Sequence, residues 1–429
     1  MNFSDFSTLI YAVIFFVLVG LFLTVLILWT RMKLVRRTPC KIHINDDESL
    51  TKEVRGGTTL LNALLTNDIS IPSPCGGKAT CLQCKVQVVE GGGDVLETDK
   101  AAFTPKELKE GFRLSCQCKV KNDLKLVIPS DLLEVKEFKG KVVSNENVAT
   151  FIKELVVQID PKDGFDYRSG AYLLFHIPQY KTNTSDWKET IELVYQPDWE
   201  KFNMFNKQID FSSAEPETRA YSMGSYPAEG LTFKFDIRIA TPPFVGGKLS
   251  NKPWGMGSSY LFSLKEGDEI SLSGPYGESF MIDNDKELIF LIGGAGASFG
   301  RSHILHLFNT EKTKRKVTLW YGARSIKENI YQEEYEKLAE EFENFSYHLV
   351  LSEPTKEDIE SGWPTKEQDP IRTNYLFKAF QLDQLDKMDE PDEKLYYVCG
   401  PPMHNISVMK LLDDYGVLRE SIVLDDFGS

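Results

Sequence analysis

A run of 21 uncharged, mostly apolar residues near the start of the chain restricts the possible folds more than any other feature. It extends from Leu9 to Trp29 as LIYAVIFFVLVGLFLTVLILW. A helix of this length, at ~1.5 Å per residue, spans the ~30 Å hydrocarbon layer of a bilayer. A signal peptide is the alternative, but its apolar core has only ~7–15 residues and its basic residues come first. Here Asp5 precedes the run and the basic stretch RMKLVRR follows it. The sequence therefore predicts a transmembrane helix at about residues 9–29, within an N-terminal segment 1–37.

The charges around this run also predict an orientation. Basic residues remain on the cytoplasmic side of a membrane, so we expect a single-pass protein with its N-terminus outside and its remaining domains in the cytoplasm. The chain has 429 residues, of which 26% are charged and 42% hydrophobic, and such a length allows about two to four domains with cores of their own. The formal net charge of -14 argues against a nucleic-acid-binding face.

Seven cysteines are present, and five of them lie between residues 75 and 118. A secreted domain stapled by disulfides would be shorter and would have an even number of cysteines. A reducing cytoplasm further disfavours disulfides and favours metal ligation. The spacing is Cys75-x5-Cys81-x2-Cys84, followed by 31 residues and then Cys116. A structural zinc site remains the minor alternative, since zinc sites usually combine C-x2-C with a second close pair.

Three cysteines in one loop and a fourth from far along the chain resemble the plant-type [2Fe–2S] ferredoxin pattern. The first spacer departs from that pattern, because it has five residues where the usual one has about four. Cys118 competes with Cys116 as fourth ligand. Successive strand residues point to opposite faces, so we choose Cys116 and expect Cys118 to be a buried neutral thiol. Short strands and one helix at 58–68 predict a small β-grasp, ferredoxin-like domain at 38–133.

The middle of the chain, residues 137–283, predicts an antiparallel β-barrel. Within it, residues 233–239 (FKFDIRI) alternate between apolar and charged side chains, which is typical of a strand with one solvated face. The polar segment between Pro178 and Arg219 suggests a surface excursion or docking loop.

Two short motifs in this barrel resemble the R-x-Y-S and G-x-x-S flavin motifs of ferredoxin–NADP+ reductase-type proteins. The first contains Arg219, Tyr221 and Ser222, and the second contains Gly255 and Ser258. An arginine binds a pyrophosphate with its forked guanidinium. The resemblance implies that the tyrosine lies against the isoalloxazine ring of FAD and that the Ser222 hydroxyl reaches the N5 region. Ser258, at a helix start, would offer N–H groups to phosphate.

In residues 284–429, strands alternate with helices, which predicts an α/β, doubly wound nucleotide-binding domain. Two turns are expected at the carboxyl ends of its strands, where ligands bind. The predicted dinucleotide-binding residues are Gly293, Gly294 and Gly296 of GGAGAS, and Cys399, Gly400 and Pro401 of CGPP. In reductases of this type the cysteine lies by the nicotinamide, and a terminal aromatic, here Phe427, covers the flavin. Arg324 could favour NADPH, whereas Glu353 could bind the ribose hydroxyls of NADH.

The chain resembles the F-subunit family of sodium-translocating NADH:quinone reductases over essentially the full length. The resemblance lies in the order of its features, which are the anchor, the cysteine loop, RAYS, GGAGAS, CGPPMHN and LDDFG. This resemblance implies NADH oxidation with FAD and one [2Fe–2S] cluster, in a bacterial cell inner membrane complex whose other subunits reduce quinone and move Na+. It favours NADH over NADPH. The implied catalytic residues are Tyr221, Ser222, Cys399 and Phe427.

Two other functions are compatible with parts of the sequence. One is a membrane-tethered reductase component that feeds an oxygenase, although such components are usually soluble. The other is a non-enzymatic metal-binding scaffold or redox sensor, which the flavin and nucleotide motifs disfavour.

Overall fold

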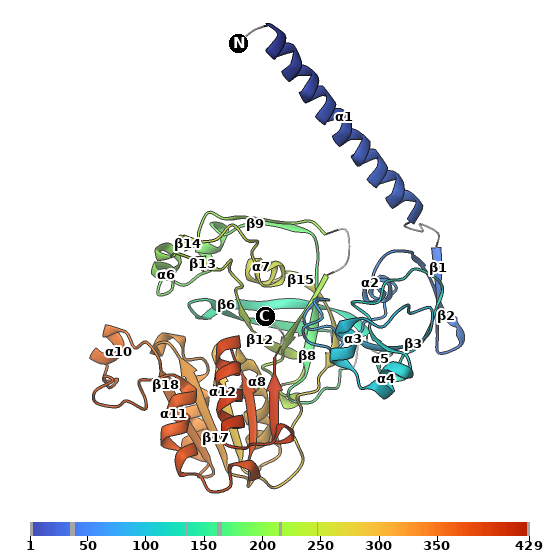
Figure 1. Ribbon diagram of the computed structural model, residues 1–429. Helices are drawn as coiled ribbons and strands as arrows, with labels where there is room; N and C mark the ends of the chain where they lie inside the picture. The colour runs from blue at the N-terminus through green and yellow to red at the C-terminus, as the bar shows by residue number, and fades with distance from the viewer. Residues whose placement is uncertain are drawn as a thin grey trace. The chain divides into compact units, whose positions relative to one another are not determined.

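The computed structural model describes residues 3–34, 39–133, 136–160, 165–213, 217–246 and 248–426. Side chains are described for these residues except 3–10, 28, 31–34, 131, 136 and 248. The chain divides into two compact units (Figure 1). The first unit is Met1–Ile71 with Cys84–Leu133, and the second is Pro72–Gln83 with Glu134–Ser429.

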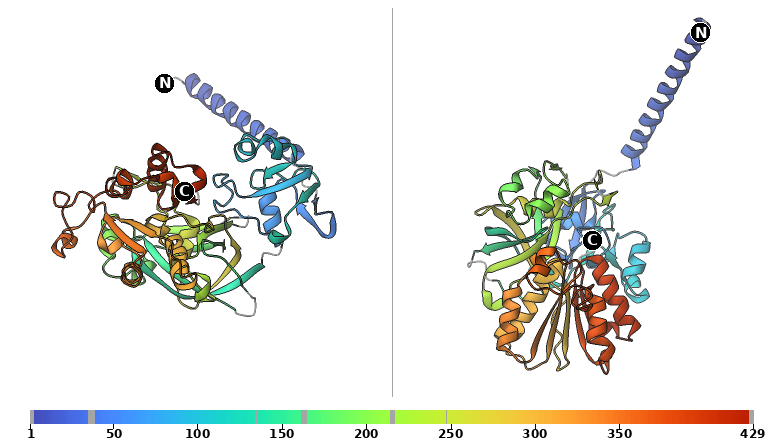
Figure 2. Two further views of the ribbon diagram at one scale, coloured as in Figure 1. Left: turned by 90° about the horizontal axis from the view of Figure 1, so that it is seen from below. Right: turned by 90° about the vertical axis from the view of Figure 1, so that its left-hand side faces the viewer.

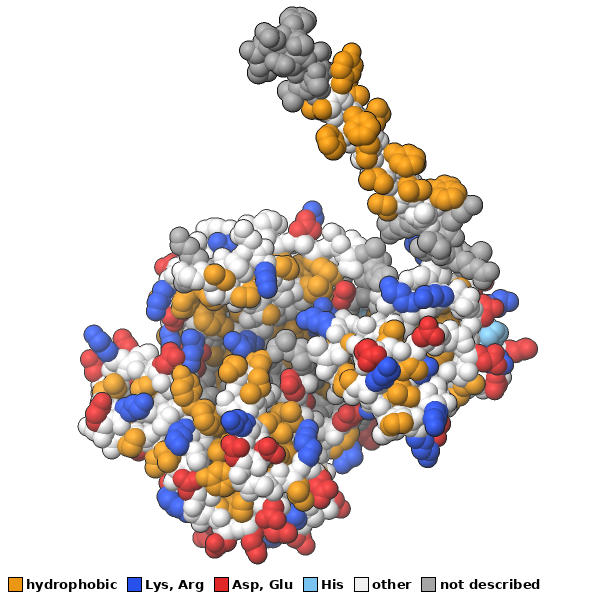
Figure 3. Space-filling view, in the orientation of Figure 1, with side chains coloured by type: hydrophobic (Ala, Val, Ile, Leu, Met, Phe, Trp, Pro, Cys, Tyr) orange, Lys and Arg blue, Asp and Glu red, His pale blue; other side chains and the backbone are white. Residues whose placement is uncertain are grey.

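The first helix, α1 (Phe3–Leu34), contains the uncharged run. Its described side chains are mostly large, apolar and exposed, from Tyr11 to Trp29 (Figure 3). Thr24 and Thr30 donate their hydroxyls to the backbone carbonyls of Gly20 and Leu26, four residues earlier. The expected span from Leu9 begins before the described side chains. Among the residues that the structure describes, no helix is both long enough and apolar enough to cross a bilayer.

The remainder of the first unit is a five-stranded mixed sheet with the order β2-β1-β5-β3-β4. Its first two strands form an antiparallel hairpin, and β1 and β5 run parallel. The helix expected over 58–68 begins at Leu60, because the Thr59 hydroxyl caps it by accepting the N–H of Asn62. The elements are β1 Pro39–Ile44, β2 Asp47–Arg55, α2 Leu60–Leu65, β3 Lys85–Glu90, α3 Glu97–Ala102, α4 Pro105–Lys109, β4 Phe112–Leu114, β5 Leu124–Val127 and α5 Ser130–Leu133.

The second unit begins with a six-stranded antiparallel sheet of order β11-β8-β15-β6-β7-β12. The two strands at the ends of this order, β11 and β12, contact each other, so the sheet curls into a barrel. Helix α7 packs against β8 and β12. The elements are β6 Lys136–Ala149, β7 Ile152–Ile159, β8 Tyr172–Ile177, β11 Glu217–Ser222, β12 Thr232–Arg238, α7 Met256–Ser263 and β15 Glu269–Tyr276.

Strand β12 departs from the expected alternation. Phe233, Phe235 and Ile237 are buried in the barrel core, as predicted, but Asp236 on the opposite face is only 5% exposed. Residues of the nucleotide-binding part cover that face: Ser298 accepts the backbone N–H of Asp236, and Tyr331 contacts its carboxyl. The expectation of a solvated second face is therefore wrong at Asp236.

The segment between Pro178 and Arg219 is also different from the prediction of a surface excursion. Trp187 and Trp199 are 2% and 0% exposed and belong to the barrel core. Trp199 donates its indole N–H to the Thr150 carbonyl at 2.7 Å. Among the described large apolar residues of this segment, only Leu193 and Val194 are exposed. Its elements, with the following hairpin, are β9 Tyr180–Asn183, α6 Gln196–Lys201, β10 Gln208–Phe211, β13 Phe244–Val245 and β14 Lys248–Leu249.

The last part of the second unit is a five-stranded parallel sheet of order β18-β17-β16-β19-β20, as the sequence predicts. Helices cover both faces (Figure 2), and all six residues of β16 are buried, with alternate side chains in two separate cores. The chain order reverses between β16 and β19, and ligands bind outside the carboxyl ends of strands at such a point. The elements are β16 Leu288–Gly293, α8 Ala297–Leu305, β17 Val317–Ala323, α9 Gln332–Glu341, β18 Phe345–Leu351, α10 Lys356–Glu360, α11 Leu376–Asp383, β19 Leu395–Cys399, α12 Pro402–Asp414 and β20 Ile422–Asp425.

Candidate active site

A cavity of about 300 Å³ joins the two sets of motifs that the sequence singles out. We call it the Tyr221 cavity. From the barrel it receives the end of β11 and part of β12, and from the nucleotide-binding part it receives the turns after β16 and β19. Its lining residues are Ala220, Tyr221, Ser222, Asp236, Arg238, Ala295, Gly296, Ser298, Cys399, Gly400, Pro401, Pro402, Asp425 and Asp426. Six predicted site residues thus share one cavity: Tyr221, Ser222, Gly296, Cys399, Gly400 and Pro401.

The Tyr221 ring is held by its neighbours. It meets the Phe175 ring edge to face, with 5.3 Å between the centroids. Burial raises the pKa of Tyr221 well above its usual value, so the hydroxyl remains protonated. A rigid, neutral aromatic ring at a cavity wall is suited to contact a flat ligand.

A carboxyl group that the sequence analysis did not select lies in the same cavity. Asp425, at the end of β20, accepts the Ser222 hydroxyl at 2.7 Å, and the Cys399 thiol lies 3.9 Å from the same oxygen. Burial raises the pKa of Asp425 to about 7, and burial also raises the pKa of Cys399 well above its usual value. Cys399 is therefore a neutral thiol and not a thiolate.

Gly296 is required by a close approach. A Cβ atom there would lie 2.4 Å from the carbonyl oxygen of Cys399 and 3.0 Å from its sulfur. The absence of a side chain lets the turn after β16 contact the turn after β19. Gly400 is similar, since a Cβ there would lie 2.6 Å from the ring of His404.

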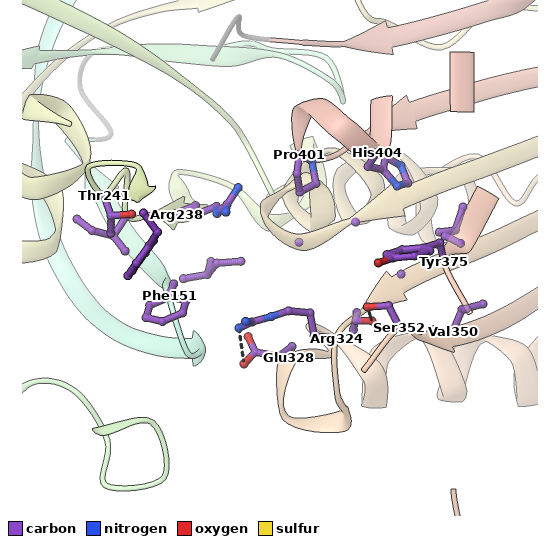
Figure 4. A pocket seen from close by; sticks show the side chains of 18 of the residues that line it. Phe151, Arg238, Thr241, Arg324, Glu328, Val350, Ser352, Tyr375, Pro401 and His404 are labelled. Carbon is purple, nitrogen blue, oxygen red and sulfur yellow. Dashed lines mark hydrogen bonds and ion pairs between the residues drawn. The ribbon is translucent and has the colours of Figure 1, made fainter. Parts of the chain in front are cut away.

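A second cavity, of about 560 Å³, opens at the carboxyl ends of β16, β17 and β18 (Figure 4). We call it the Arg324 cavity. It contains the predicted residues Gly293, Gly294 and Pro401. Its other lining residues are Phe151, Ile152, Phe202, Met204, Arg238, Ile239, Thr241, Phe244, Gly322, Ala323, Arg324, Glu328, Val350, Ser352, Asn374, Tyr375, Leu376 and His404. Aromatic rings beside a glycine turn are suited to a nucleotide.

Of the two arginines that line this cavity, Arg324 is already paired. Arg324 lies 3.4 Å from the Glu328 carboxylate, as the dashed line in Figure 4 shows. Glu328 also accepts the backbone N–H of Thr150 at 3.1 Å and the hydroxyl of the same residue. Glu353, the acidic candidate from the sequence, is exposed and is not among the residues that line this cavity.

The remaining flavin-motif residues lie beside the start of α7 and line neither cavity. Arg219 donates to the Glu217 carboxylate at 2.9 Å and to the Met256 sulfur at 3.1 Å. Gly257 has no room for a side chain, because a Cβ would lie 2.6 Å from Cγ of Arg219. Gly255 precedes the first residue of α7, and Ser258 uses its buried hydroxyl internally, toward Ala240 and Gly255. The Ser258 side chain therefore fixes the loop, and only backbone groups at this helix start could face a phosphate.

The four predicted cluster ligands occur as two pairs of thiols. The Cys75 and Cys81 sulfurs lie 3.3 Å apart in the loop Pro72–Gln83 of the second unit. Cys84 and Cys116, in the first unit, are hydrogen-bonded to each other. Among the described residues, no three Cys, His, Asp or Glu side chains converge as a metal site within the structure. The complete ligand set therefore stays a prediction.

The Cys118 thiol contacts a backbone carbonyl and not another thiol. Its thiol is 6% exposed and lies 3.8 Å from the Gly92 carbonyl, and burial raises its pKa to about 11. The neutral, buried role expected for it agrees with this geometry, but the expected cause, strand alternation, is wrong. Cys116 and Cys118 lie in a turn after β4, where the N–H groups of Gln117 and Cys118 both bond to Leu114, so strand alternation does not separate them.

Phe427, expected over the flavin ring, lies outside the described residues. The lining residues that were not selected from the sequence include the acidic residues Asp236, Glu328 and Asp425. A signal existed for Asp425, since it stands two positions before Phe427 in the motif LDDFG.

Comparisons with known proteins agree with this architecture. Residues 42–121 match the family described as 2Fe-2S iron-sulfur cluster binding domain, and residues 290–408 match the family described as oxidoreductase NAD-binding domain. Among solved structures, the Amycolatopsis cytochrome P450 reductase GcoB has a TM-score of 0.59 at 18% identity, covering 90% of this chain and 98% of that one. At this identity the likeness shows the fold alone. The two matched families define an oxidoreductase that combines an NAD-binding domain with a 2Fe-2S iron-sulfur domain.

Sequence relatives identify the family more closely. The chain is 57% identical to the F subunit of Na(+)-translocating NADH-quinone reductase from Chlamydia pneumoniae, over 97% of each chain. It is 58% identical to the protein of the same name in Chlamydia felis (strain Fe/C-56), over 96% of each chain. The chain therefore belongs to the F-subunit family of Na(+)-translocating NADH-quinone reductases.

Proposed function

We propose that this chain is the electron-input subunit of a Na+-translocating NADH:quinone reductase, and that it oxidises NADH with FAD and one [2Fe–2S] cluster. The observation that carries the proposal is the Tyr221 cavity, where the flavin motif and the nicotinamide motif line one space. Family membership supports the same function.

The residues present fit these groups. The two thiol pairs supply sulfur donors of the kind that iron–sulfur clusters require. A Cβ at Gly296 would collide with the turn after β19, and a Cβ at Gly400 would collide with the ring of His404 on α12. FAD, when bound, accepts two electrons as a hydride and releases them singly, and a [2Fe–2S] cluster carries one electron at a time. Cys75, Cys81, Cys84 and Cys116 would hold the cluster, whereas Arg219 and Tyr221 would hold the flavin.

The protein's own groups position the reactants. The Tyr221 ring, fixed by Phe175, provides a flat wall. The Ser222 hydroxyl is oriented by Asp425, and the neutral Cys399 thiol lines the same cavity without an ionic charge. Phe427 is proposed to cover the site. In the Arg324 cavity the glycine turn would accept the pyrophosphate of NADH and Glu328 would lie near its ribose.

We further propose that α1 anchors the chain in the bacterial inner membrane as a single span, with the N-terminus outside and the domains in the cytoplasm. The uncharged run, its position within a 32-residue helix and the basic residues after it support this proposal. The internal hydrogen bonds of Thr24 and Thr30 also support it, since hydroxyls without partners are costly in lipid. The partners would be the other subunits of the complex, with quinone reached through them.

Anaerobic titration of the purified protein with NADH tests the function. Visible absorbance should show flavin bleaching, and electron paramagnetic resonance should then show a reduced [2Fe–2S] signal. A protein without flavin absorbance, or one whose flavin NADH does not bleach, would contradict the proposal. A bleached flavin without the cluster signal would contradict its second half.

A further inference from the structure

The carboxyl group of Asp236 is unusual among the groups that line the Tyr221 cavity. The residue is 5% exposed, and its Oδ2 atom is buried without a hydrogen-bond partner. Its other oxygen, Oδ1, lies 2.9 Å from the hydroxyl of Tyr331. Among the described residues, no lysine or arginine forms an ion pair with Asp236. A buried carboxyl without a cation is costly as an anion.

The hydroxyl of Tyr331 connects two carboxyl groups. It lies 2.9 Å from Oδ1 of Asp236 and 2.9 Å from Oε2 of Glu154. A tyrosine hydroxyl has only one proton, so it can donate to only one of them. The second contact is a hydrogen bond only if that carboxyl is itself protonated and donates to the tyrosine oxygen. A second proton in this group would satisfy both contacts.

The surrounding charges locate that proton on Asp236. Both oxygens of Glu154 lie 3.1 Å from the ammonium group of Lys234, so this carboxyl is paired with a cation. Asp236 has no such partner, and burial, followed by the charge of Glu154, raises its pKa to about 7. At neutral pH Asp236 can therefore both hold and release a proton.

The three residues extend from the cavity wall to solvent. Asp236 lines the cavity, Tyr331 is in the middle, and the side chains of Glu154 and Lys234 are 17% and 29% exposed. Tyr331 has a φ of 62°, in the left-handed region that is unfavourable for a residue with a side chain. The Arg301 guanidinium, 5.2 Å from its ring centroid, helps to hold it in place.

We propose that Asp236, Tyr331 and Glu154 form a proton path from solvent to the Tyr221 cavity, which operates when the bound flavin is reduced. This proposal rests on the proposed function. NADH supplies two electrons and one proton as a hydride and leaves as NAD+. A bound flavin would need one further proton to be neutral after accepting the hydride, and the O–H bond of Asp236 would supply it. Tyr331 passes its proton to Asp236 and is reprotonated from solvent through Glu154.

Other charged and titratable groups face this path. Arg301 on α8 is neutralised by Glu229 and Glu334, and Tyr321 on β17 is close to Asp236. Arg238, Asp425 and Asp426 line the same cavity. Asp425 is the rival proton donor, because it also has a pKa of about 7. The structure favours Asp236 as the proton donor because its two oxygens have different contacts. Oδ1 is connected to Glu154 through the hydroxyl of Tyr331, and Oδ2 has no hydrogen-bond partner.

The test measures proton uptake and flavin bleaching together. The holoprotein is mixed anaerobically with NADH in weakly buffered solution that contains a pH-indicator dye, and both signals are recorded by stopped flow. In the unmodified protein we expect uptake of one proton in phase with bleaching. Asp236→Asn and Tyr331→Phe should each leave flavin content unchanged and slow proton uptake by roughly 100-fold, so that it lags behind bleaching.

Asp210→Asn is the matched control, because Asp210 is an exposed carboxylate paired with Lys181. It should take up the proton like the unmodified protein. The proposal is overturned if both path variants take up the proton in phase with bleaching, if Asp425→Asn alone causes the lag, or if the unmodified protein takes up no proton at or below neutral pH. Absence of bleaching in the unmodified protein would instead contradict the proposed function. If the Asp236→Asn variant does not fold, the Tyr331→Phe variant alone tests the proposed proton path.

Discussion

The Ser222 hydroxyl donates a 2.7 Å hydrogen bond to Oδ2 of Asp425, although 203 residues separate the two in the chain. The contact joins the last residue of β11 in the barrel to the last residue of β20 in the parallel sheet. It fixes the direction of the hydroxyl inside the Tyr221 cavity and supplies a nearby carboxyl that is partly protonated at neutral pH.

Loss of this hydroxyl should slow the reaction with NADH without releasing the flavin. Ser222→Ala removes the hydrogen bond to Asp425, and a positioned hydroxyl near the reacting atoms contributes roughly 10–100-fold. We expect flavin bleaching after mixing with NADH to slow by that factor, while the flavin-to-protein ratio stays constant. Ser263→Ala is a suitable control, since that hydroxyl bonds only to the carbonyl of Tyr260 at the end of α7. An unchanged bleaching rate in Ser222→Ala would contradict the role of Ser222.

The cysteine pair after β4 should respond unequally to substitution. Cys116→Ser should abolish the reduced [2Fe–2S] signal in electron paramagnetic resonance, because Cys116 is the proposed fourth ligand. Cys118→Ser should retain that signal, since its thiol lies against the Gly92 carbonyl and a serine hydroxyl can donate there. The two variants are matched controls for each other. A cluster that survives in Cys116→Ser but not in Cys118→Ser would reverse the assignment.

The nucleotide preference should depend on Glu328. Its carboxylate neutralises Arg324 in the Arg324 cavity, and it would repel a 2′-phosphate. Glu328→Gln should free the guanidinium and raise the ratio of kcat/KM for NADPH to that for NADH by about tenfold, which is ~1.4 kcal/mol. Glu353→Gln, outside the lining of this cavity, should leave the ratio unchanged. If only Glu353→Gln shifts the ratio, Glu328 is not the discriminating residue.

Stability should fall as pH rises toward neutral, because of the buried carboxyl of Asp236. Its pKa rises from 3.8 to about 7 on folding, so between these values the native state binds more protons than the unfolded state. The stabilising contribution of protonated Asp236 is fully present below about pH 4 and is lost as pH rises through about 7. The free energy of unfolding falls by on the order of 2–4 kcal/mol over this range.

Asp236→Asn should remove the share of that dependence that Asp236 contributes, while the share of Asp425 remains. The difference in urea midpoint between about pH 5 and about pH 8, followed by far-ultraviolet circular dichroism, should be smaller in the variant than in the unmodified protein. Asp210→Asn should keep the full difference, since Asp210 is exposed. Equal pH dependence in all three proteins would show that Asp236 ionises normally.

Local patterns in the sequence were sufficient to predict the helices and strands that carry the motifs. The RAYS and CGPP segments sit at strand ends because an apolar strand precedes or contains each, and Ser222 and Cys399 consequently meet in one cavity. The order of the parallel sheet follows from alternating strands and helices. These features depend on short stretches of chain and on general rules of packing.

The residues that were missed depend on contacts between distant elements. Alternation in FKFDIRI separates two faces of β12 but does not say that Ser298 and Tyr331 cover the second face, so the pattern alone places Asp236 in solvent. The polar insert contains Trp187 and Trp199, and two tryptophans in a supposed surface loop were an available signal of burial. Cys116 and Cys118 were separated by a strand rule in a segment that is a turn.

The burial of Trp187 and Trp199, in the segment between Pro178 and Arg219, also bears on where the chain's tryptophan fluorescence originates. Of the six tryptophans, Trp29 is in α1 and the other five lie in the second unit, at 187, 199, 254, 320 and 363. The cysteine-bearing sheet of the first unit has none. Tryptophan emission therefore reports on the barrel and the parallel sheet, and unfolding of the iron–sulfur domain alone would be nearly silent in that signal. Its loss has to be followed through the visible colour of the cluster.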